Sequence, residues 1–148
     1  MSKEDFIYAA GLIDGEGTIT LSRGSARDLY RHPVVSVPSC TTTLVETMKS
    51  LFGGCISNKK PSKPKHALSQ AWCVRYDAAI TCLKQILPFL REPEKIRRAK
   101  LILDEYKGLT PRNGRYTILQ RQAKLDFERR FFDSPIKPNR DASRLRLN

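Results

Sequence analysis

Apolar residues recur along this chain with two periods, about 3.6 and 2, which predicts a mixture of helices and strands. Near the start, apolar side chains at helical spacing follow Ser2, so a helix capped by Ser2 is expected to run to about Gly15 or Gly17. The chain then alternates over residues 18–23. This alternation predicts a half-buried strand whose Ile19 and Leu21 side chains point inward.

The two periods continue to residue 132. They predict strands at 33–37, 55–59 and 68–76, and helices at 41–52, 77–87, 93–107 and 116–132. Asp77 is expected to cap the third helix. The last helix is expected to pack through its apolar residues Ile118, Leu119, Ala123, Leu125, Phe127 and Phe131.

The order of these elements is helix, strand, strand, helix, strand, strand, helix, which predicts an α+β fold with a four-stranded antiparallel sheet. Helices are expected on one face of that sheet. The other face has no covering element in this count. An uncovered face on a basic protein suits a saddle that lies against a nucleic-acid duplex.

The length of 148 residues fits one domain, expected over residues 1–133, followed by a basic, flexible tail at 134–148. The N-terminal residues lack a signal-peptide pattern, and no apolar stretch approaches the roughly 18 residues that span a membrane. We therefore expect an intracellular protein without a membrane partner.

Charge gives the first indication of function. The chain has 27 Lys and Arg against 15 Asp and Glu, a net charge of +12. A cation placed near a phosphate releases condensed counterions, so such an excess favours nucleic acid as the partner. A solubilising surface or attraction to acidic lipid is the alternative, but no basic amphipathic helix supports the lipid.

The four cysteines form no Cys-x-x-Cys pair, and the two histidines lie apart in the sequence, which argues against a zinc site. Cys55, Cys73 and Cys82 occur in apolar or strand-like contexts. We expect them to be buried free thiols, as in a reducing compartment.

The segment from Ala9 to Gly17 places two carboxylates, Asp14 and Glu16, where the first helix ends. Gly11 and Gly15 are four residues apart on one helix face and would let a second copy of this helix approach closely. Two copies would bring two Glu16 carboxylates together, an arrangement that a divalent cation such as Mg²⁺ stabilises. The alternative is a capped helix that runs into a hairpin, with both carboxylates merely solvated.

The same segment resembles the LAGLIDADG motif of the homing endonucleases. The match runs from Ala10 through Asp14 and includes Gly17, while Gly15 replaces Ala, Glu16 replaces the second Asp and Ala9 replaces the leading Leu. Two later stretches also resemble the family: Leu51-Phe52-Gly53-Gly54, and Pro88-Phe89-Leu90-Arg91 followed by Lys95.

The resemblance implies a metal-dependent DNA endonuclease. Glu16 and the backbone carbonyl of Gly15 would bind Mg²⁺, with Mn²⁺ or Ca²⁺ also able to occupy the site. Lys95 would supply the basic group of the active site and Ser39 a polar group, although an ordinary exposed helix lysine is the alternative for Lys95.

A single motif implies a homodimer that cuts a long, near-palindromic DNA site. The interface is expected at Ala10, Gly11, Asp14 and Gly15. Genes of this family commonly lie in introns or inteins, which points to the cytoplasm of a prokaryote or phage-infected cell, or to a chloroplast or mitochondrion.

The sheet is expected to enter the major groove, where base edges are distinguishable. The candidate DNA-binding residues are Thr18, Thr20, Ser22, Arg23, Arg27, Arg31, His32, Ser36, Lys59, Lys60, Lys63, Lys65, Gln70, Trp72 and Arg75. Trp72 could equally belong to the core, and the loop cations could be merely solvated. An RNA-binding intron maturase, or a non-catalytic DNA-binding protein of the same fold, remains an alternative function.

Overall fold

The computed structural model describes residues 1–59 and 69–136, which form four β-strands and five α-helices. The strands are β1 (Thr18–Ser22), β2 (His32–Ser39), β3 (Cys55–Lys59) and β4 (Ser69–Arg75). The α-helices are α1 (Lys3–Glu16), α2 (Thr42–Phe52), α3 (Tyr76–Ile86), α4 (Pro93–Leu101) and α5 (Ile118–Phe132). Short helical segments η1 (Leu87–Phe89), η2 (Ile102–Tyr106) and η3 (Lys107–Leu109) lie between α3 and α5. The predicted α+β class and element order are confirmed.

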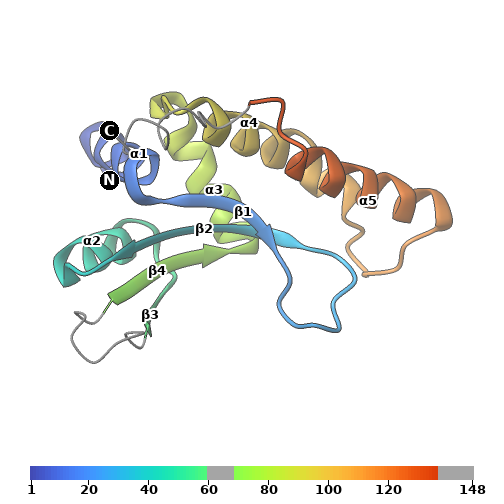
Figure 1. The fold of residues 1–148 in the computed structure, drawn as a ribbon, viewed down its shortest axis with the longest axis horizontal. Coiled ribbons are helices and arrows are strands. Elements are labelled where there is room, and N and C mark those ends of the chain that lie inside the picture. Colours follow the sequence, from blue (N-terminus) through green and yellow to red (C-terminus); the bar gives the residue numbers. More distant parts are fainter. Residues whose placement is uncertain (60–68, 137–148) are drawn as a thin grey trace, which may run out of the picture.

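The strands form one antiparallel sheet in the order β1-β2-β4-β3. Helices α1, α2, α3 and α4 pack on one face, while the part of the chain that the structure describes places no helix over the other (Figure 1). Burial follows this division, because Ile19 and Leu21 are buried whereas Thr18 on the other face of β1 is exposed. The predicted orientation of β1 is therefore correct.

The first helix begins and ends where the sequence predicts. Ser2 accepts a hydrogen bond from the Asp5 N–H, and the Asp5 carboxylate accepts one from the Ser2 N–H, which forms a capping box. At the other end, the Gly17 N–H donates to the Ile13 carbonyl. A Cβ on Gly17 would lie 2.7 Å from Ile13 Cα, so this tight exit into β1 requires glycine.

Three local predictions were wrong. Asp77 is in the first turn of α3 but does not cap it, since the N-cap is Arg75, without a side-chain hydrogen bond. The helix expected over 93–107 becomes π-helical at η2 and then 3-10 at η3. In α5, Ile118 and Leu119 are more than three-quarters exposed, because the buried face carries Lys124, Phe127, Glu128 and Phe131 instead.

The residues that follow α5 contact α4. The Ser134 hydroxyl donates a hydrogen bond to the Glu94 carboxylate, which attaches this part of the chain to α4. The rest of the predicted tail, residues 137–148, lies outside the described residues. Among the described helices, none combines the length and apolar character needed to cross a bilayer.

Candidate active site

The end of α1 presents an exposed carboxylate beside two glycines. Glu16 is exposed at the last position of the helix, and Gly15 is exposed beside it. Asp14 has a different role, since its carboxylate accepts hydrogen bonds from the N–H groups of Arg91 and Glu92, at 2.9 and 3.2 Å. Of the two acidic residues, Asp14 thus holds the start of α4 in place, whereas the Glu16 side chain has no hydrogen-bond or ion-pair partner among residues 1–59 and 69–136.

Lys95 lies directly at the end of α1. Its ammonium group donates hydrogen bonds to the carbonyl oxygens of Ile13 (2.8 Å) and Asp14 (2.6 Å). Glu92 caps α4 by accepting hydrogen bonds from the N–H groups of Glu94 and Lys95. This cap fixes the start of the helix and therefore the position of Lys95 in its first turn. The structure thus places Lys95 at the end of the motif helix, through contacts with backbone carbonyls.

A hollow of about 400 Å³ adjoins Glu16. Its walls come from α1, the end of β2, α2 and the start of β4, and they are formed by Leu12, Glu16, Pro38, Ser39, Cys40, Leu44 and Ser69. The Ser39 hydroxyl accepts a hydrogen bond from the Thr41 N–H at 2.9 Å. Glu16 and Ser39, two of the three predicted catalytic residues, therefore line one hollow.

One copy of the chain offers few ligands for a metal ion. Within residues 1–59 and 69–136, no group of three or more His, Cys, Asp or Glu side chains is arranged to hold a metal ion. The Glu16 carboxylate and the Gly15 carbonyl are hard oxygen donors of the type that Mg²⁺ and Ca²⁺ prefer. These donors fit a divalent cation chemically, and a second α1 beside the first would double their number.

The free face of α1 has room for a second helix. Gly11 and Gly15 are exposed, and a Cβ added at either position would meet no atom within 4 Å. Ile7 and Tyr8 on the same helix are each 47% exposed. Asp14 is half-buried at the edge of this surface. The prediction for Ala10 was wrong, because Ala10 is fully buried in the core and cannot contact a partner helix.

The uncovered sheet face carries most of the predicted polar readers. The register places Thr18 beside Ser36 and Ser22 beside His32, and β4 contributes Arg75 at the same end of this face. Thr18 and Arg75 are exposed, while Thr20, Ser22 and Ser36 are half-buried. These residues are available to a duplex laid on the sheet.

Three predicted readers do not expose their side chains on the uncovered face. Trp72 is fully buried, and its indole N–H donates to the Gly53 carbonyl at 2.8 Å, so it belongs to the core. Gln70 shares the covered face with Trp72 and donates to the Asn58 side chain at 3.0 Å. His32 is only 4% exposed because its ring stacks on Tyr76, with centroids 4.0 Å apart. This burial lowers the pKa of His32.

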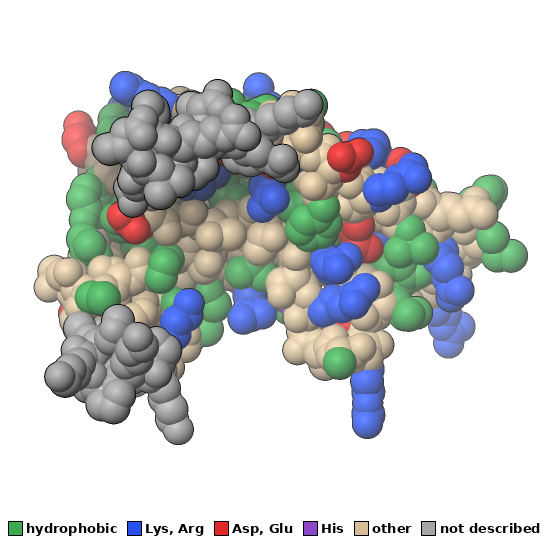
Figure 2. Space-filling view, in the orientation of Figure 1, with side chains coloured by type: hydrophobic (Ala, Val, Ile, Leu, Met, Phe, Trp, Pro, Cys, Tyr) green, Lys and Arg blue, Asp and Glu red, His purple; other side chains and the backbone are tan. Residues whose placement is uncertain are grey.

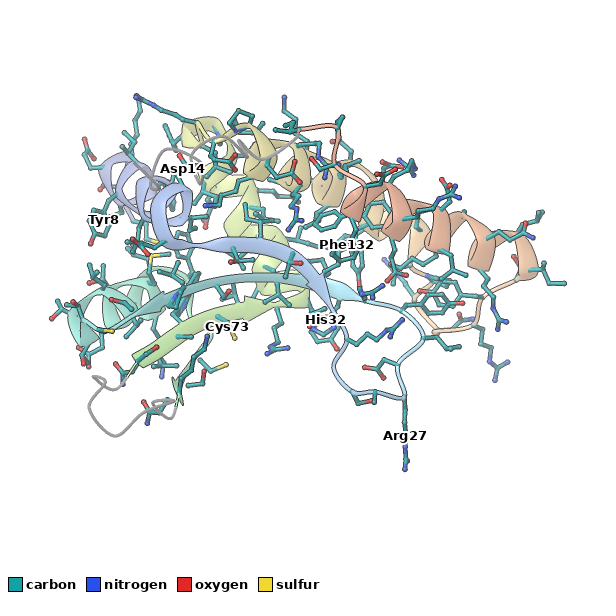
Figure 3. All side chains as sticks on the ribbon, in the orientation of Figure 1. Tyr8, Asp14, Arg27, His32, Cys73 and Phe132 are labelled. Atoms are coloured by element: carbon teal, nitrogen blue, oxygen red, sulfur yellow. The ribbon has the colours of Figure 1, made fainter. Side chains whose placement is uncertain are left out.

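Some of the predicted basic residues are exposed, and one is paired within the fold. Arg23 and Arg27, in the loop between β1 and β2, and Lys59, at the end of β3, are exposed. Figure 3 shows Arg27 projecting from the loop, and Figure 2 shows Lys and Arg side chains around that side of the molecule. Arg31 is held within the fold, since it pairs with Glu128 at 3.4 Å and lies over the Phe132 ring. Lys60, Lys63 and Lys65 lie outside the described residues.

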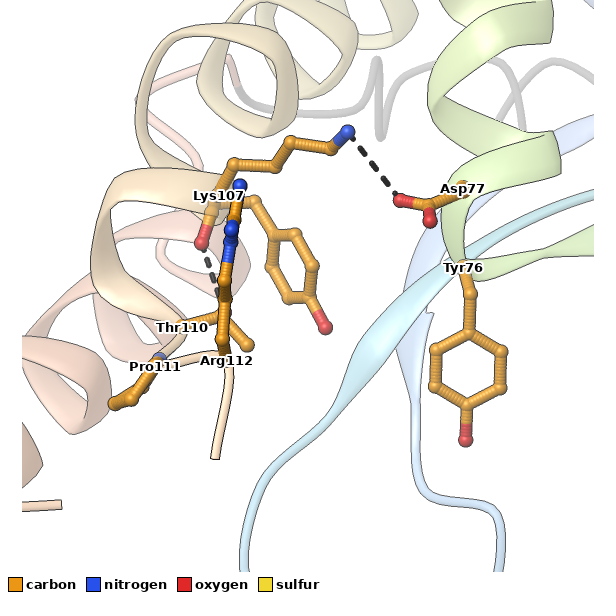
Figure 4. Close-up of a pocket in the computed structure, with 7 residues that line it drawn as sticks. Tyr76, Asp77, Lys107, Thr110, Pro111 and Arg112 are labelled. Carbon is orange, nitrogen blue, oxygen red and sulfur yellow. Dashed lines mark hydrogen bonds and ion pairs between the residues drawn. The ribbon is translucent and has the colours of Figure 1, made fainter. Parts of the chain in front are cut away.

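A second hollow, of about 600 Å³, lies at the opposite end of the sheet, beyond Arg75 (Figure 4). Tyr76 and Asp77 line it on one side, and Lys107 and Arg112 on the other. Tyr76 has φ +52°, a left-handed conformation that is uncommon for a residue with a side chain. This hollow is remote from Glu16 and adds no group to the candidate active site.

Sequence reasoning missed Ser69 and Glu92 at this site. Ser69 lines the hollow beside Glu16 because β4 begins next to the end of β2. Glu92 precedes Pro93 and Glu94, and a polar residue followed by proline at the first helical position is a signal for a helix start. That signal could have identified Glu92 as the cap, whereas the position of Ser69 depends on the strand pairing.

Comparisons with known proteins connect this fold to a family. Neither the models of protein families nor the curated proteins include a match. Among solved structures, the chain is similar to the homing endonuclease I-CvuI in complex with its target, with 22% identity, a TM-score of 0.64, and coverage of 92% of this chain and 87% of that chain.

Two further structures extend the likeness. The archaeal intron-encoded homing endonuclease I-Vdi141I, complexed with DNA, has 19% identity and a TM-score of 0.66 over 96% of this chain and 92% of that chain. The LAGLIDADG homing endonuclease I-GzeII, in complex with a DNA target, has 15% identity and a TM-score of 0.57 over 86% of this chain and 44% of that chain. This chain therefore has the fold of the LAGLIDADG homing endonucleases, the family that its first helix resembles.

Proposed function

We propose that this chain is a site-specific DNA endonuclease that acts as a homodimer and requires a divalent cation. The observation that carries the proposal is the position of Glu16, an exposed carboxylate at the end of α1, next to Lys95 and at the edge of an uncovered sheet face. The structural neighbours, solved with DNA targets, support a duplex as the ligand of that face.

The dimer would form through the free face of α1. Gly11 and Gly15 leave space for a second backbone, and the exposed Ile7 and Tyr8 supply apolar surface at the same helix. A two-fold axis along this surface would place the two Glu16 carboxylates side by side. It would also join two sheets into one long basic surface, which suits a long, near-palindromic DNA site.

In each subunit, Glu16 and the Gly15 carbonyl would hold the cation, for which Mg²⁺ is the proposed identity. A bound divalent cation supplies a more acidic water and offsets charge on the phosphate. Lys95 holds the carbonyls of Ile13 and Asp14, so it fixes the backbone that presents Glu16. Its positive charge also favours a phosphate that becomes more negative during the reaction.

Polar and basic groups on the uncovered face and its loops would bind and position the duplex. Arg23, Arg27 and Lys59 are placed for phosphate contacts, and Thr18, Ser36 and Arg75 face the groove from the strands. Ser39 would help to order water in the hollow beside Glu16.

The test compares Glu16→Gln with the parent protein on a library of DNA duplexes in the presence of Mg²⁺. The amide keeps the shape of the side chain but loses the charge, so cleavage should be abolished while DNA affinity is largely retained. Calorimetry should show weaker Mg²⁺ binding by the variant. Glu4→Gln is the matched control, because Glu4 is an exposed carboxylate at the other end of α1.

Undiminished cutting by Glu16→Gln would refute the role of Glu16. A parent protein that binds duplex DNA but never cuts it would instead be a non-catalytic DNA-binding protein, and one that binds only structured intron RNA would be a maturase.

A further inference from the structure

Two cysteines lie side by side on the uncovered sheet face. Cys55 begins β3 and Cys73 is its direct partner in β4, so their side chains point to the same side of the sheet. Their Sγ atoms are 3.8 Å apart. Cys55 is exposed and Cys73 half-buried, which contradicts the prediction that both thiols are buried in the core. Figure 3 shows Cys73 on the side of β4 away from α1.

The backbone around this pair is suited to a disulfide. Directly opposed residues in antiparallel strands have Cα atoms about 4.5–5.5 Å apart, which lies within the range that a disulfide spans. Gly54, just before Cys55, permits this close approach, since a Cβ there would lie 2.3 Å from the Cys73 carbonyl oxygen. The sulfurs need only move from 3.8 Å to about 2.05 Å, the length of an S–S bond.

The other two cysteines do not share this geometry. Cys82 is buried in α3, and burial raises the pKa of its thiol to about 12, so it is shielded and stays protonated. Cys40 is exposed but lies at the hollow beside Glu16, at the other end of the sheet from Arg75. Cys82 therefore serves as an internal control for a shielded thiol, and the exposed Cys40 has to be removed before the pair is tested.

We propose that Cys55 and Cys73 form a reversible disulfide under oxidising conditions, and that this disulfide weakens DNA binding. The second part rests on the proposed function, which lays this sheet face on DNA. The bond fixes the side chains of Cys55 and Cys73 on the face of the sheet that also carries Ser57 and Arg75. A rigid bridge also replaces two thiols that can adapt to the groove.

A disulfide of the glutathione type can act as the oxidant. One cysteine thiolate attacks a sulfur of oxidised glutathione and forms a mixed disulfide, and one glutathione thiolate leaves. The second cysteine thiolate then attacks the protein sulfur and releases the other glutathione. Two protons and two electrons pass in total from the two cysteines to the two glutathione molecules. The hydrogen bond with Cys73 raises the pKa of the Cys55 thiol, so oxidation should accelerate as the pH rises.

The first experiment maps the disulfide without DNA. Full-length protein carrying Cys40→Ser, which removes intermolecular bridging through that exposed thiol, is incubated with oxidised glutathione, alkylated and digested. Mass spectrometry should find a Cys55–Cys73 cross-linked peptide that dithiothreitol removes, and Cys82 should be free. Cys55→Ser in the same background should give no internal cross-link. Stable glutathione adducts on both cysteines, with no cross-link, would overturn the proposed disulfide.

The second experiment measures DNA affinity of the oxidised and reduced forms by fluorescence anisotropy. We expect oxidation to weaken binding about tenfold, the equivalent of one lost hydrogen bond to a charged group. Dithiothreitol should restore the affinity, and the Cys55→Ser control should not respond to oxidant. Equal affinities of fully cross-linked and reduced protein would overturn the effect on DNA while leaving the disulfide in place. A reduced protein that binds no DNA would instead count against the proposed function, because the peptide map does not depend on DNA.

Discussion

The ammonium group of Lys95 lies 2.6 Å from the carbonyl oxygen of Asp14 and donates a hydrogen bond to it. This contact joins α4 to the end of α1, where the carbonyl groups of a helix lack partners and carry partial negative charge. Lys95 is therefore both a positive charge near Glu16 and a cap for the helix that presents Glu16.

We predict that Lys95→Met slows cleavage about 10²-fold or more in single-turnover assays, as loss of a positioned charge does in other enzymes. Because the carbonyls of Ile13 and Asp14 lose their donor, the free energy of unfolding should also fall by about 1–3 kcal/mol. Urea denaturation measures the second effect. Lys100→Met, which removes an exposed lysine from the same helix, should change neither quantity.

Salt-titrated DNA binding separates this role from a simple phosphate contact. If Lys95→Met lowers only the affinity for DNA and leaves the single-turnover rate unchanged, Lys95 contacts a DNA phosphate and has no part in the chemical step. Arg97 and Arg98 cannot then replace it, since both are paired with Glu94, and Arg98 also donates to the Ile19 carbonyl.

Gly11→Leu should separate the proposed dimer without unfolding the subunit. The added side chain enters open space in one subunit, and replacing glycine inside a helix generally favours the helix. It would, however, occupy the space that a second α1 needs. Light scattering at micromolar concentration should report a dimer for the parent and a monomer for the variant.

Gly108→Leu is the matched control for this change, because Gly108 also has open space around it but lies in η3, away from α1. Its oligomeric state should equal that of the parent. A Gly11→Leu protein that remains dimeric and active would place the interface elsewhere.

Arg75 and Arg31 should respond differently to substitution by alanine. Arg75 is exposed on the uncovered sheet face, so Arg75→Ala should weaken DNA binding and reduce the salt slope by about one unit if it contacts phosphate. Arg31→Ala should instead lower the free energy of unfolding by about 1–2 kcal/mol, because buried Glu128 loses part of its pairing. Binding titrations and urea denaturation on both variants measure the contrast, and identical behaviour would contradict it.

The sequence predicts the limits of an element well where a single residue type determines where that element begins or ends. Ser2 can cap and Gly17 can turn tightly, so the limits of α1 could be inferred without tertiary information. The alternation of Ile19 and Leu21 likewise identifies the buried face of β1. The approximate position of Lys95 followed from the family resemblance, and the structure adds the carbonyl contacts.

Predictions failed where partners come from distant segments. Alternation alone does not show which face of β4 is covered, so it predicts Gln70 as a DNA reader and leaves Trp72 open between DNA and the core. In the structure Trp72 packs beside Phe52 of α2. In α5, apolar content suggested Ile118 and Leu119 as the packing face. The buried face instead includes the charged Lys124 and Glu128, which find partners in Thr110 and Arg31.

Lys124 leads to a prediction about pH. Its side chain is almost fully buried, with Nζ 2.5 Å from the Thr110 hydroxyl and 3.9 Å from the centre of the Tyr106 ring. Burial lowers its pKa to about 8 from an ordinary value of 10.5, and only Glu128 opposes the shift. The folded protein therefore releases the Lys124 proton at lower pH than the unfolded chain does.

The sign of the effect follows from proton counting. Between about pH 8 and 10.5 the unfolded chain binds more protons at this residue, so the stability of the folded protein should rise with pH. The rise can approach about 1.4 kcal/mol per pH unit for one proton. Lys124→Met has no proton to release and should lack this rise, so its stability relative to the parent should be greatest near pH 7 and should decline as the pH increases.

Urea denaturation of both proteins from about pH 7 to 9.5 tests the prediction in a range below the ordinary pKa of tyrosine. The limit matters because burial raises the pKa values of Tyr106 and Tyr116, so their deprotonation on unfolding would lower stability at higher pH. Lys107→Met, at a largely exposed lysine, serves as the control and should follow the parent. If the stabilities of the parent and Lys124→Met instead change with pH in parallel, Lys124 keeps its proton in the folded protein throughout this range. The contacts with Tyr106 and Thr110 would then stabilise the charged ammonium group enough to offset its burial.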